Sequence, residues 1–299
     1  MPNSVWCRSP PARIRRWCAF VMVALVLALM TTGSGMRRHG VRVLVPVGRS
    51  VVVGPNQFEA TIDGEPWTGA VLADGHGGYW LDIDPVAKEG ATLVLRLVVA
   101  GPAPTASDRE PGVHDWLASS ALIDSSDAAI VSTAASIAGL ERSATGKIDA
   151  IHEYVASNLS WRRYPGHKDD PASTTLDLGY GTCGGLARLL VALSRAVGVP
   201  ARTVQGVVFD DSTSDVYHQW AEYRDEEGIW RAVDPTTKRG SATESRTYVD
   251  LIYAAEENPF WSDPDLAIVY DATPRKGSLG YRMIDTTAST RTLENIYEL

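Results

Sequence analysis

A lone cysteine at the start of a predicted helix is the residue of this chain best suited to nucleophilic chemistry. Cys183 lies in the segment Gly-Thr-Cys-Gly-Gly at 181–185, and an apolar run with helical spacing continues from Leu186 to Val197. The unpaired backbone N–H groups and the positive end of the dipole at a helix N-terminus favour a thiolate. Cys183 is therefore a candidate nucleophile, and the alternative for an unpaired thiol is an inert buried cysteine.

A thiolate nucleophile needs a base, and the base needs a third group that fixes its tautomer and stabilises its charge. Two predicted strands, 216–224 and 229–234, flank a polar turn of sequence Asp-Glu-Glu-Gly. A hairpin centred near Glu226 would set His218 opposite Asp234, because both residues are equally far from that centre. Opposed residues of a hairpin point to the same face, with their Cβ atoms about 5 Å apart. The sequence therefore predicts a His218–Asp234 pair on the sheet against which the cysteine helix must pack.

Four short motifs in a fixed order give the chain a resemblance to a known family. They are Gly-Thr-Cys-Gly-Gly at 181–185, Arg-Ala-Val-Gly-Val-Pro-Ala-Arg at 195–202, His-Gln-Trp at 218–220 and Trp-Arg-Ala-Val-Asp-Pro-Thr at 230–236. With these motifs the region from about 148 to 236 resembles the bacterial transglutaminase-like superfamily. This papain-like grouping includes transglutaminases, peptide amidases and cysteine proteases.

The resemblance implies a role for each member of the constellation. Cys183 would be the nucleophile, His218 the base and acid, and Asp234 the group that orients the histidine. Gln219 departs from the small residue often seen between the histidine and the tryptophan of this family. It should point away from His218 and leave the three residues undisturbed.

An acyl-transfer site of this kind also needs donors for the oxyanion that forms at the carbonyl. The backbone N–H of Cys183 is one candidate donor. The second donor is open: Trp161 and Tyr164 lie upstream of the cysteine, and either could equally serve in packing.

The elements that must position these residues change in character along the chain. Short alternating runs from Val41 to Ala100 predict antiparallel strands. Helical spacing follows: a helix capped by Asp127 that ends near Gly139, a helix at 144–158 with His152 beside its apolar stripe, and the cysteine helix capped by Thr182, with strands afterwards at 201–209, 216–224 and 229–234. The expected class is α+β, with a papain- or transglutaminase-like core of helices packed on an antiparallel sheet, preceded by a small β-rich domain. His152 is expected to be structural.

These patterns predict four parts along the chain. They are a signal peptide or membrane anchor at 1–38, a β-rich N-terminal domain at 39–105, a transglutaminase-like catalytic domain at 106–245, and a C-terminal extension at 246–299. A Pro- and Ala-rich linker separates the second part from the third. The extension, in which 266–270 and 281–284 read as short strands, is expected to complete the catalytic sheet or flank the cleft.

Residues 1–38 have the order of an export signal. They contain six arginines, no acidic residue and an apolar run from Cys18 to Met30. The uncharged span of 20 residues between Arg16 and Arg37 is also long enough to cross a bilayer. A cleaved signal peptide and a single-pass anchor both remain open, and either predicts that the bulk of the chain is exported: secreted, periplasmic or attached to the membrane by this segment.

The net charge limits the classes of partner that are expected, and the number of cysteines limits the disulfides that can form. The net charge is −8, and an acidic surface argues against nucleic acid or anionic lipid as the partner of the folded part. Cys7 and Cys18 belong to the leader, so an exported chain would carry Cys183 alone and could form no internal disulfide.

No metal or cofactor is expected. Several acidic and histidine residues could be mistaken for ligands, but they read better as solvated loops or turns: Asp82 and Asp84, the run His167-Lys168-Asp169-Asp170, and Asp210, Asp211 and Asp215.

The function expected from these features is that of an exported thiol acyl-transfer enzyme. It would act on peptide or side-chain amides of a protein or peptide substrate through Cys183, His218 and Asp234 and a thioester intermediate. Hydrolysis would make it a cysteine protease or amidase, which is the preferred reading, whereas an amine acceptor would make it a protein-glutamine transglutaminase. A non-catalytic binding or scaffold module on the same fold is the alternative from another class.

Overall fold

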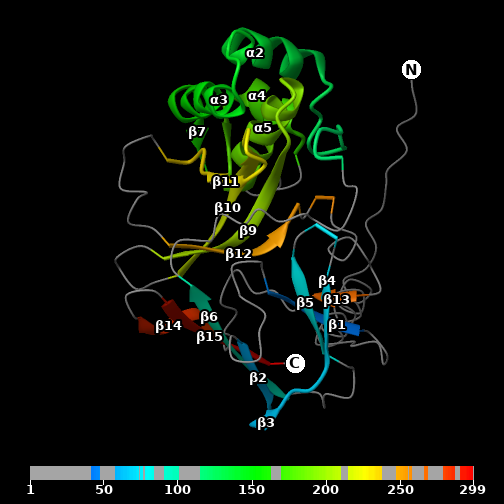
Figure 1. Ribbon diagram of the computed structural model, residues 1–299, viewed down its shortest axis with the longest axis vertical. Helices are drawn as coiled ribbons and strands as arrows, with labels where there is room; N and C mark the ends of the chain where they lie inside the picture. The colour runs from blue at the N-terminus through cyan, green and yellow to red at the C-terminus, as the bar shows by residue number, and fades with distance from the viewer. Residues whose placement is uncertain are drawn as a thin grey trace, which may run out of the picture. The chain divides into compact units, whose positions relative to one another are not determined.

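The structure is a computed structural model that describes residues 42–47, 58–73, 75–76, 78–83, 91–100, 115–162, 170–209, 215–237, 247–254, 256–257, 266–268, 279–286 and 290–298 (Figure 1). The predicted leader at 1–38 lies outside these residues, and so do Tyr164, the His167–Asp169 run, Asp84, Asp210 and Asp211. Within the described ranges no helix has both the length and the apolar character needed to span a membrane.

Four helices lie in the described part of the chain: α2 (Ala128–Ala138), α3 (Ala144–Asn158), α4 (Ala172–Leu178) and α5 (Cys183–Ala196). The Asp127 carboxylate caps α2 by accepting from the backbone N–H groups of Ala129 and Ile130 at 2.8 and 3.3 Å. The Thr182 hydroxyl caps α5 by accepting from the Gly185 N–H at 3.2 Å. Both predicted caps are confirmed, because short polar side chains satisfy N–H groups that lack a partner in the first turn.

The polar, Pro-interrupted sequence from Trp161 to Leu178 predicts a loop, and this prediction is wrong for its described ends. Ser160–Trp161 forms the short strand β7, and Ala172–Leu178 forms α4, which Gly179 ends with φ of 68°. Seven residues span only about two turns, too few for a helical period to stand out in the sequence. Ala172 and Thr175 are buried in α4, so tertiary packing is what stabilises this helix.

Three sheets of four or five strands are described, together with the parallel pair β7–β8, in which β8 is Tyr180–Gly181. The first contains β13-β1-β5-β4, the second β11-β10-β9-β12 and the third β14-β15-β6-β2-β3. The strands are β1 (Arg42–Val47), β2 (Phe58–Ile62), β3 (Glu65–Pro66), β4 (Ala70–Ala73), β5 (Tyr79–Ile83), β6 (Thr92–Ala100), β9 (Ala201–Phe209), β10 (Asp215–Arg224), β11 (Trp230–Val233), β12 (Thr247–Tyr253), β13 (Leu266–Ile268), β14 (Leu279–Thr286) and β15 (Thr290–Glu298).

The last part of the chain contributes to all three of these sheets. β12 pairs antiparallel with one edge of β9, and the other edge of β9 pairs with β10, which carries His218. β13 pairs with β1, and β15 pairs with β6 along its whole length. The expected α+β class is confirmed, since helices pack on an antiparallel sheet and a β-rich segment precedes them; the domain boundaries stay a prediction.

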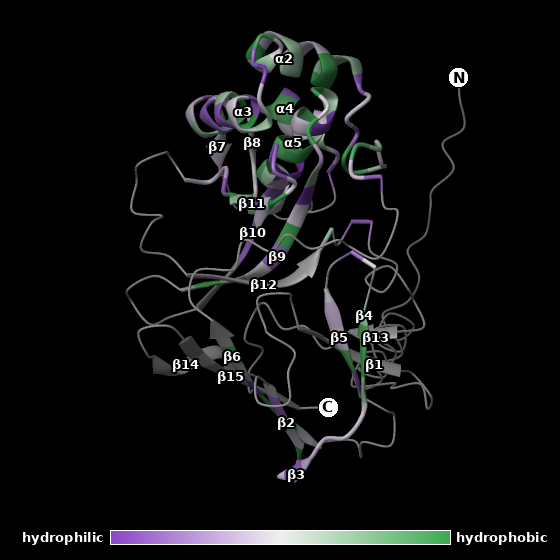
Figure 2. Ribbon diagram, viewed as in Figure 1, coloured by the Kyte–Doolittle hydropathy of each residue, from purple (hydrophilic) through white to green (hydrophobic). Residues whose placement is uncertain are grey.

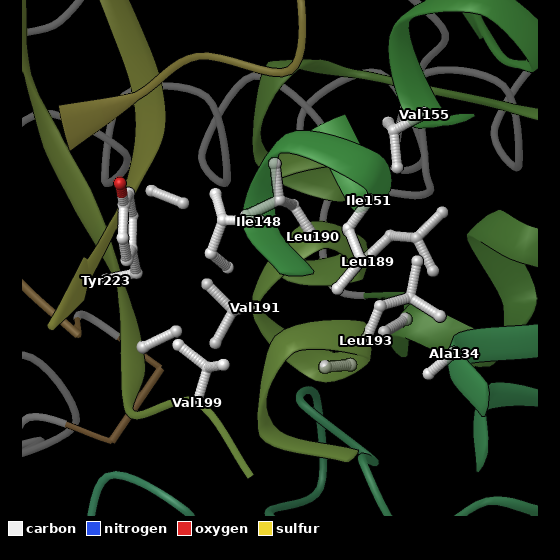
Figure 3. Close-up of a cluster of buried hydrophobic side chains, with 14 of the residues drawn as sticks. Ala134, Ile148, Ile151, Val155, Leu189, Leu190, Val191, Leu193, Val199 and Tyr223 are labelled. Carbon is white, nitrogen blue, oxygen red and sulfur yellow. The ribbon is translucent and has the colours of Figure 1, made fainter. Parts of the chain in front are cut away.

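The core is centred on α5, of whose 14 residues all those from Gly184 to Arg195 are buried. Its apolar side chains share one buried cluster with residues of α3 and with Tyr223 of β10. Figure 3 shows Ile148 and Ile151 of α3 beside Leu189 and Leu190 of α5. α3 itself carries both hydrophilic and hydrophobic segments (Figure 2), as a helix with one solvent-facing side should.

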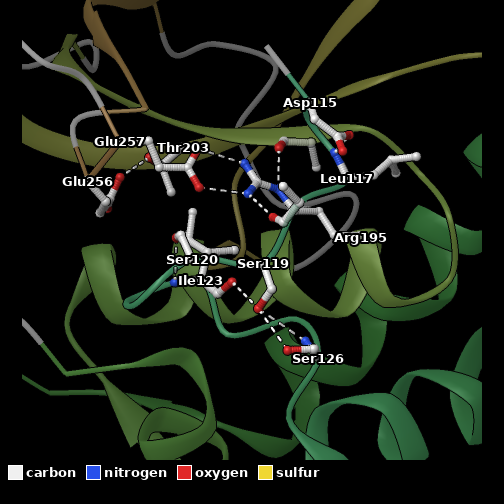
Figure 4. A network of polar contacts seen from close by, with 12 residues as sticks. Asp115, Leu117, Ser119, Ser120, Ile123, Ser126, Arg195, Thr203, Glu256 and Glu257 are labelled. Atoms are coloured by element: carbon white, nitrogen blue, oxygen red, sulfur yellow. Dashed lines mark hydrogen bonds and ion pairs between the residues drawn. The ribbon is translucent and has the colours of Figure 1, made fainter.

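Two buried arginines of α5 are paired with glutamates from a turn that follows β12. Arg195 and Glu257 form an ion pair at 2.8 Å (Figure 4). Arg188 lies 3.8 Å from Glu256, whose other oxygen accepts from the Thr203 hydroxyl. Leaving one partner of a buried pair alone would be strongly unfavourable, so the buried arginines of α5 depend on this distant turn for their counter-charges.

The packing around α5 predicts a large cost for a cavity. Leu190 is fully buried in the core cluster, and Leu190→Ala is expected to lower the free energy of unfolding by about 2–5 kcal/mol. Urea denaturation followed by circular dichroism measures this change. Val131→Ala, at a side chain that is 44% exposed, is the control and should shift stability by less than about 0.5 kcal/mol; equal effects of the two variants would refute a core centred on α5.

Candidate active site

Cys183 is the first residue of α5 and is partly buried. Burial raises the pKa of its thiol. The hydrogen bond to His218, the positive charge of that residue, and hydrogen bonds from the backbone N–H groups of Gln219 and Gly184 outweigh burial and lower the thiol pKa below its ordinary value. The site therefore favours a thiolate, as the helix N-terminus predicted.

His218 connects the thiol to a carboxylate. Its Nε2 lies 2.8 Å from Oδ2 of Asp234, which leaves Nδ1 as the ring nitrogen for Cys183. Burial lowers the pKa of His218, but the hydrogen bonds to Asp234 and Cys183 and their charges raise it to about 9. His218 is therefore favoured as an imidazolium near neutral pH, and its contact with Cys183 makes the thiol easier to ionise.

Exposure falls from one member of this constellation to the next. The side chain of His218 is 13% exposed and that of Asp234 is 5% exposed. Burial raises the pKa of Asp234, but hydrogen bonds from His218 and Thr236 and the charge of His218 overcome this and lower it. The carboxylate thus stays ionised behind a histidine that still reaches solvent.

The register proposed for the hairpin is wrong, although the two residues do meet. β10 and β11 pair Arg224 with Trp230, and the Asp225 N–H donates to the Ile229 carbonyl at 2.9 Å. The loop therefore holds three residues, with Gly228 at φ of 79°, and is centred one residue later than expected. His218 is set two positions from Asp234 in this register, an even number, so both side chains keep to the same face.

Asp234 sits at the head of a turn that holds it at several points. Its Oδ1 accepts from the Thr236 N–H at 2.9 Å and from the Thr236 hydroxyl at 2.7 Å. Its backbone carbonyl lies 2.9 Å from Nε2 of His152 and accepts from the Thr237 hydroxyl at 2.9 Å. Neither threonine is among the site residues that the sequence predicts. The spacing Asp-Pro-Thr was the available signal, because such short polar residues bond to the backbone in turns.

Gln219 packs against the start of the cysteine helix. Its Oε1 occupies the place where a Cβ on residue 184 would lie, so the glycine at 184 lets this side chain approach. Trp161, one of the two candidate oxyanion donors, pairs with Gly181 in the β7–β8 ladder, two residues before Cys183, and is 56% exposed. Within the described residues no three His, Cys, Asp or Glu side chains come together as a metal site.

Comparison with known proteins gives one family match and several loose structural likenesses. The model of the transglutaminase-like superfamily matches residues 131–235, a segment that includes Cys183, His218 and Asp234. No curated protein matches the chain.

Three of the similar solved structures illustrate the likeness. A candidate cysteine protease from Cytophaga hutchinsonii is 16% identical, with 70% of this chain and 74% of that chain covered and a TM-score of 0.46. The periplasmic domain of TgpA from Pseudomonas aeruginosa is 16% identical, with 64% and 92% covered and a TM-score of 0.36. A candidate protease from Parabacteroides distasonis is 17% identical; 70% of this chain but only 42% of that chain is covered, with a TM-score of 0.32.

The depressed thiol pKa predicts how Cys183 reacts with an alkylating agent at different pH values. The thiolate is present above its lowered midpoint, so the pH midpoint of iodoacetamide modification at Cys183 should lie below that of a free thiol, about 8.5. In His218→Ala the favourable hydrogen bond and charge are lost, burial remains, and the midpoint should rise. Peptide-resolved mass spectrometry separates Cys183 from Cys7 and Cys18. A wild-type midpoint near 8.5 that His218→Ala does not move would contradict the ion pair.

Proposed function

We propose that the protein is a thiol acyl-transfer enzyme, on the premise that residues 131–235 match the model of the transglutaminase-like superfamily. Cys183 is the nucleophile, His218 is the general base and acid, and Asp234 orients the histidine. The observation that carries the proposal is the hydrogen-bonded chain from Cys183 through His218 to Asp234, with the thiol pKa lowered and the His218 pKa raised to about 9.

In the acylation step the Cys183 thiolate attacks the carbonyl carbon of an amide. The imidazolium of His218 gives its Nδ1 proton to the leaving amine, the C–N bond breaks, and a thioester remains. The backbone N–H of Cys183, at the start of α5, is the proposed donor to the oxyanion. Asp234 keeps Nε2 hydrogen-bonded throughout, so that Nδ1 faces the reacting atoms.

The second step resolves the thioester, and we assign it to water. The neutral His218 takes a proton from water, the resulting hydroxide adds to the carbonyl, and the C–S bond breaks to give a carboxylic acid and the thiolate–imidazolium pair. The remaining exposure of the His218 side chain favours this outcome, because solvent can reach the base. An amine acceptor at the same step would give a new amide, which is the transglutaminase alternative.

The substrate class we propose is a peptide or protein amide outside the cytoplasm. Residues 1–38 have the basic, apolar and small-residue order of an export segment, and this supports a cysteine protease or amidase that is secreted, periplasmic or held at the membrane. The acidic net charge of −8 favours polypeptide over nucleic acid as the partner.

A single assay separates the three functions. The protein is incubated with a glutamine-containing peptide library and a labelled primary amine, and products are identified by mass spectrometry. Cleaved peptide bonds or deamidated side chains without label support hydrolysis, label in the product together with released ammonia supports transamidation, and no Cys183-dependent product supports a binding module.

The same assay tests the assigned roles. Cys183→Ala should abolish turnover, and Asp234→Asn should lower kcat/KM by about 10²- to 10⁴-fold because the histidine loses its orienting charge. Glu226→Gln is the matched control, since this exposed carboxylate lies at the tip of the hairpin and accepts from the N–H and hydroxyl of Thr145 at the start of α3. Turnover that survives in Cys183→Ala would sink the proposal.

A further inference from the structure

The turn after β11 carries a hydroxyl at the junction of His218 and Asp234. The two carboxylate oxygens of Asp234 are used differently: Oδ2 faces Nε2 of His218 at 2.8 Å, whereas Oδ1 accepts from both the N–H and the hydroxyl of Thr236. A carboxylate that is bonded at one oxygen only could rotate about its Cβ–Cγ bond. With Thr236 on Oδ1, Oδ2 is kept pointing at the histidine.

The same hydroxyl also meets the histidine directly. Oγ1 of Thr236 lies 3.4 Å from Nε2 of His218. Because the hydroxyl hydrogen is directed to Oδ1 at 2.7 Å, the lone pairs of Oγ1 are left to face the Nε2–H group. The Nε2 proton therefore lies between two acceptor oxygens, a strong one on Asp234 and a weaker one on Thr236.

The hairpin register explains why a residue two positions after Asp234 reaches the histidine. Continued beyond Val233, the pairing of β10 with β11 would set position 236 opposite His218. The strand ends at Val233 and Pro235 has no N–H for the ladder, so the chain turns and brings Thr236 back over the carboxylate.

The backbone of the turn is fixed independently of Thr236. The Asp234 carbonyl is bonded by His152 of α3 at 2.9 Å and by the hydroxyl and N–H of Thr237 at 2.9 and 3.2 Å. Removing the Thr236 hydroxyl should therefore loosen the carboxylate, whose Oδ1 then keeps only the Thr236 N–H, without displacing the main chain of the turn.

We propose that Thr236 is a positioning residue for the reaction, which holds the Asp234 carboxylate on the His218 ring and shares the Nε2 proton, and this inference rests on the proposed function. The groups that face His218 are Cys183 from α5 and Asp234 and Thr236 from the turn, with His152 of α3 behind the Asp234 carbonyl. Burial raises the pKa of Asp234, whereas the hydrogen bond to His218 and the charge of His218 lower it. The hydrogen bonds from Thr236 lower this pKa further.

The variants Thr236→Val and Thr236→Ser test this role. Valine keeps the shape and removes the hydroxyl, and we expect kcat to fall by roughly 10- to 100-fold from misorientation of the histidine while KM changes by less than about twofold. Serine keeps the hydroxyl and should restore most of the rate. Thr145→Val is the matched control, because it removes another threonine–carboxylate hydrogen bond, to Glu226 at 3.2 Å, at an exposed position.

A readout that needs no substrate accompanies the kinetics. In Thr236→Val the C2–H resonance of His218, assigned by its loss in His218→Ala, should titrate at a lower pH than in the wild type, and the midpoint of Cys183 alkylation should rise. Thr236→Ala serves if the valine variant does not fold, as judged by circular dichroism.

The outcomes separate the two proposals. The first outcome is a low alkylation midpoint in the wild type together with kcat and titrations that are the same in Thr236→Val and Thr236→Ala. This outcome overturns the inference and leaves the proposed function standing. A serine variant as impaired as the valine variant also overturns it, because the hydroxyl would then not be the group that matters. A wild-type Cys183 that behaves as a free thiol overturns the proposed function and this inference with it.

Discussion

Burial of α5 is the constraint on which the rest of this structure depends. A helix with residues 184–195 all buried must be covered on every side, and its two arginines must be paired. α2, α3 and α4 cover it with apolar side chains, and the sheet of β9 and β10 covers it with Tyr223 and its neighbours. The charges are met by Glu256 and Glu257, about sixty residues later in the chain. Only when all these parts are in place is the N-terminus of α5, and with it Cys183, fixed against β10.

The site uses that fixed helix end and the end of a neighbouring strand pair. A thiol is presented where backbone N–H groups lack helical partners, and an imidazole is presented from the adjacent strand. The opposing effects on each pKa have the same source: burial disfavours both charged forms, while the contact between Cys183 and His218 favours them together. An ion pair that is stable only because both members are present is well suited to a reaction in which one charge attacks and the other gives up a proton.

The local parts of the fold and of the site could be predicted from the sequence because their causes are local. Asp127 and Thr182 are recognisable as helix caps from the sequence. The helix at 144–158 and the strand at 201–209 show clear periodicity in their apolar residues. The sequence predicts a hairpin centre one residue too early, because a polar turn of four residues does not show which residues form the last pair before the loop. His218 and Asp234 still meet, because a shift of two positions in the strand pairing keeps both side chains on the same face of the sheet.

Long-range features could not be predicted in this way. Nothing near Arg195 in the sequence indicates that Glu257 is its partner, and nothing near Asp234 indicates that His152 of α3 holds its carbonyl. The structural role predicted for His152 agrees with its hydrogen bond to a backbone oxygen. Its place behind Asp234 follows from the packing of α3 on α5 and β10, which only the folded chain defines.

One buried cation contacts both the β-rich segment and β11, the strand that ends one residue before Asp234. Arg202 of β9 is inaccessible to solvent; it pairs with Glu222 at 3.0 Å and donates to the carbonyl of His76, between β4 and β5, at 2.8 Å. Its guanidinium lies over the ring of Trp230, the first residue of β11, at 4.0 Å. A desolvated cation over an aromatic face is stabilised more strongly than one in water, and the planar guanidinium donates from Nε and Nη2 to Oε2 of Glu222 while Nη1 donates to the His76 carbonyl. Arg202 therefore contacts both the β-rich segment, through the His76 carbonyl, and Trp230, the first residue of the strand that precedes Asp234.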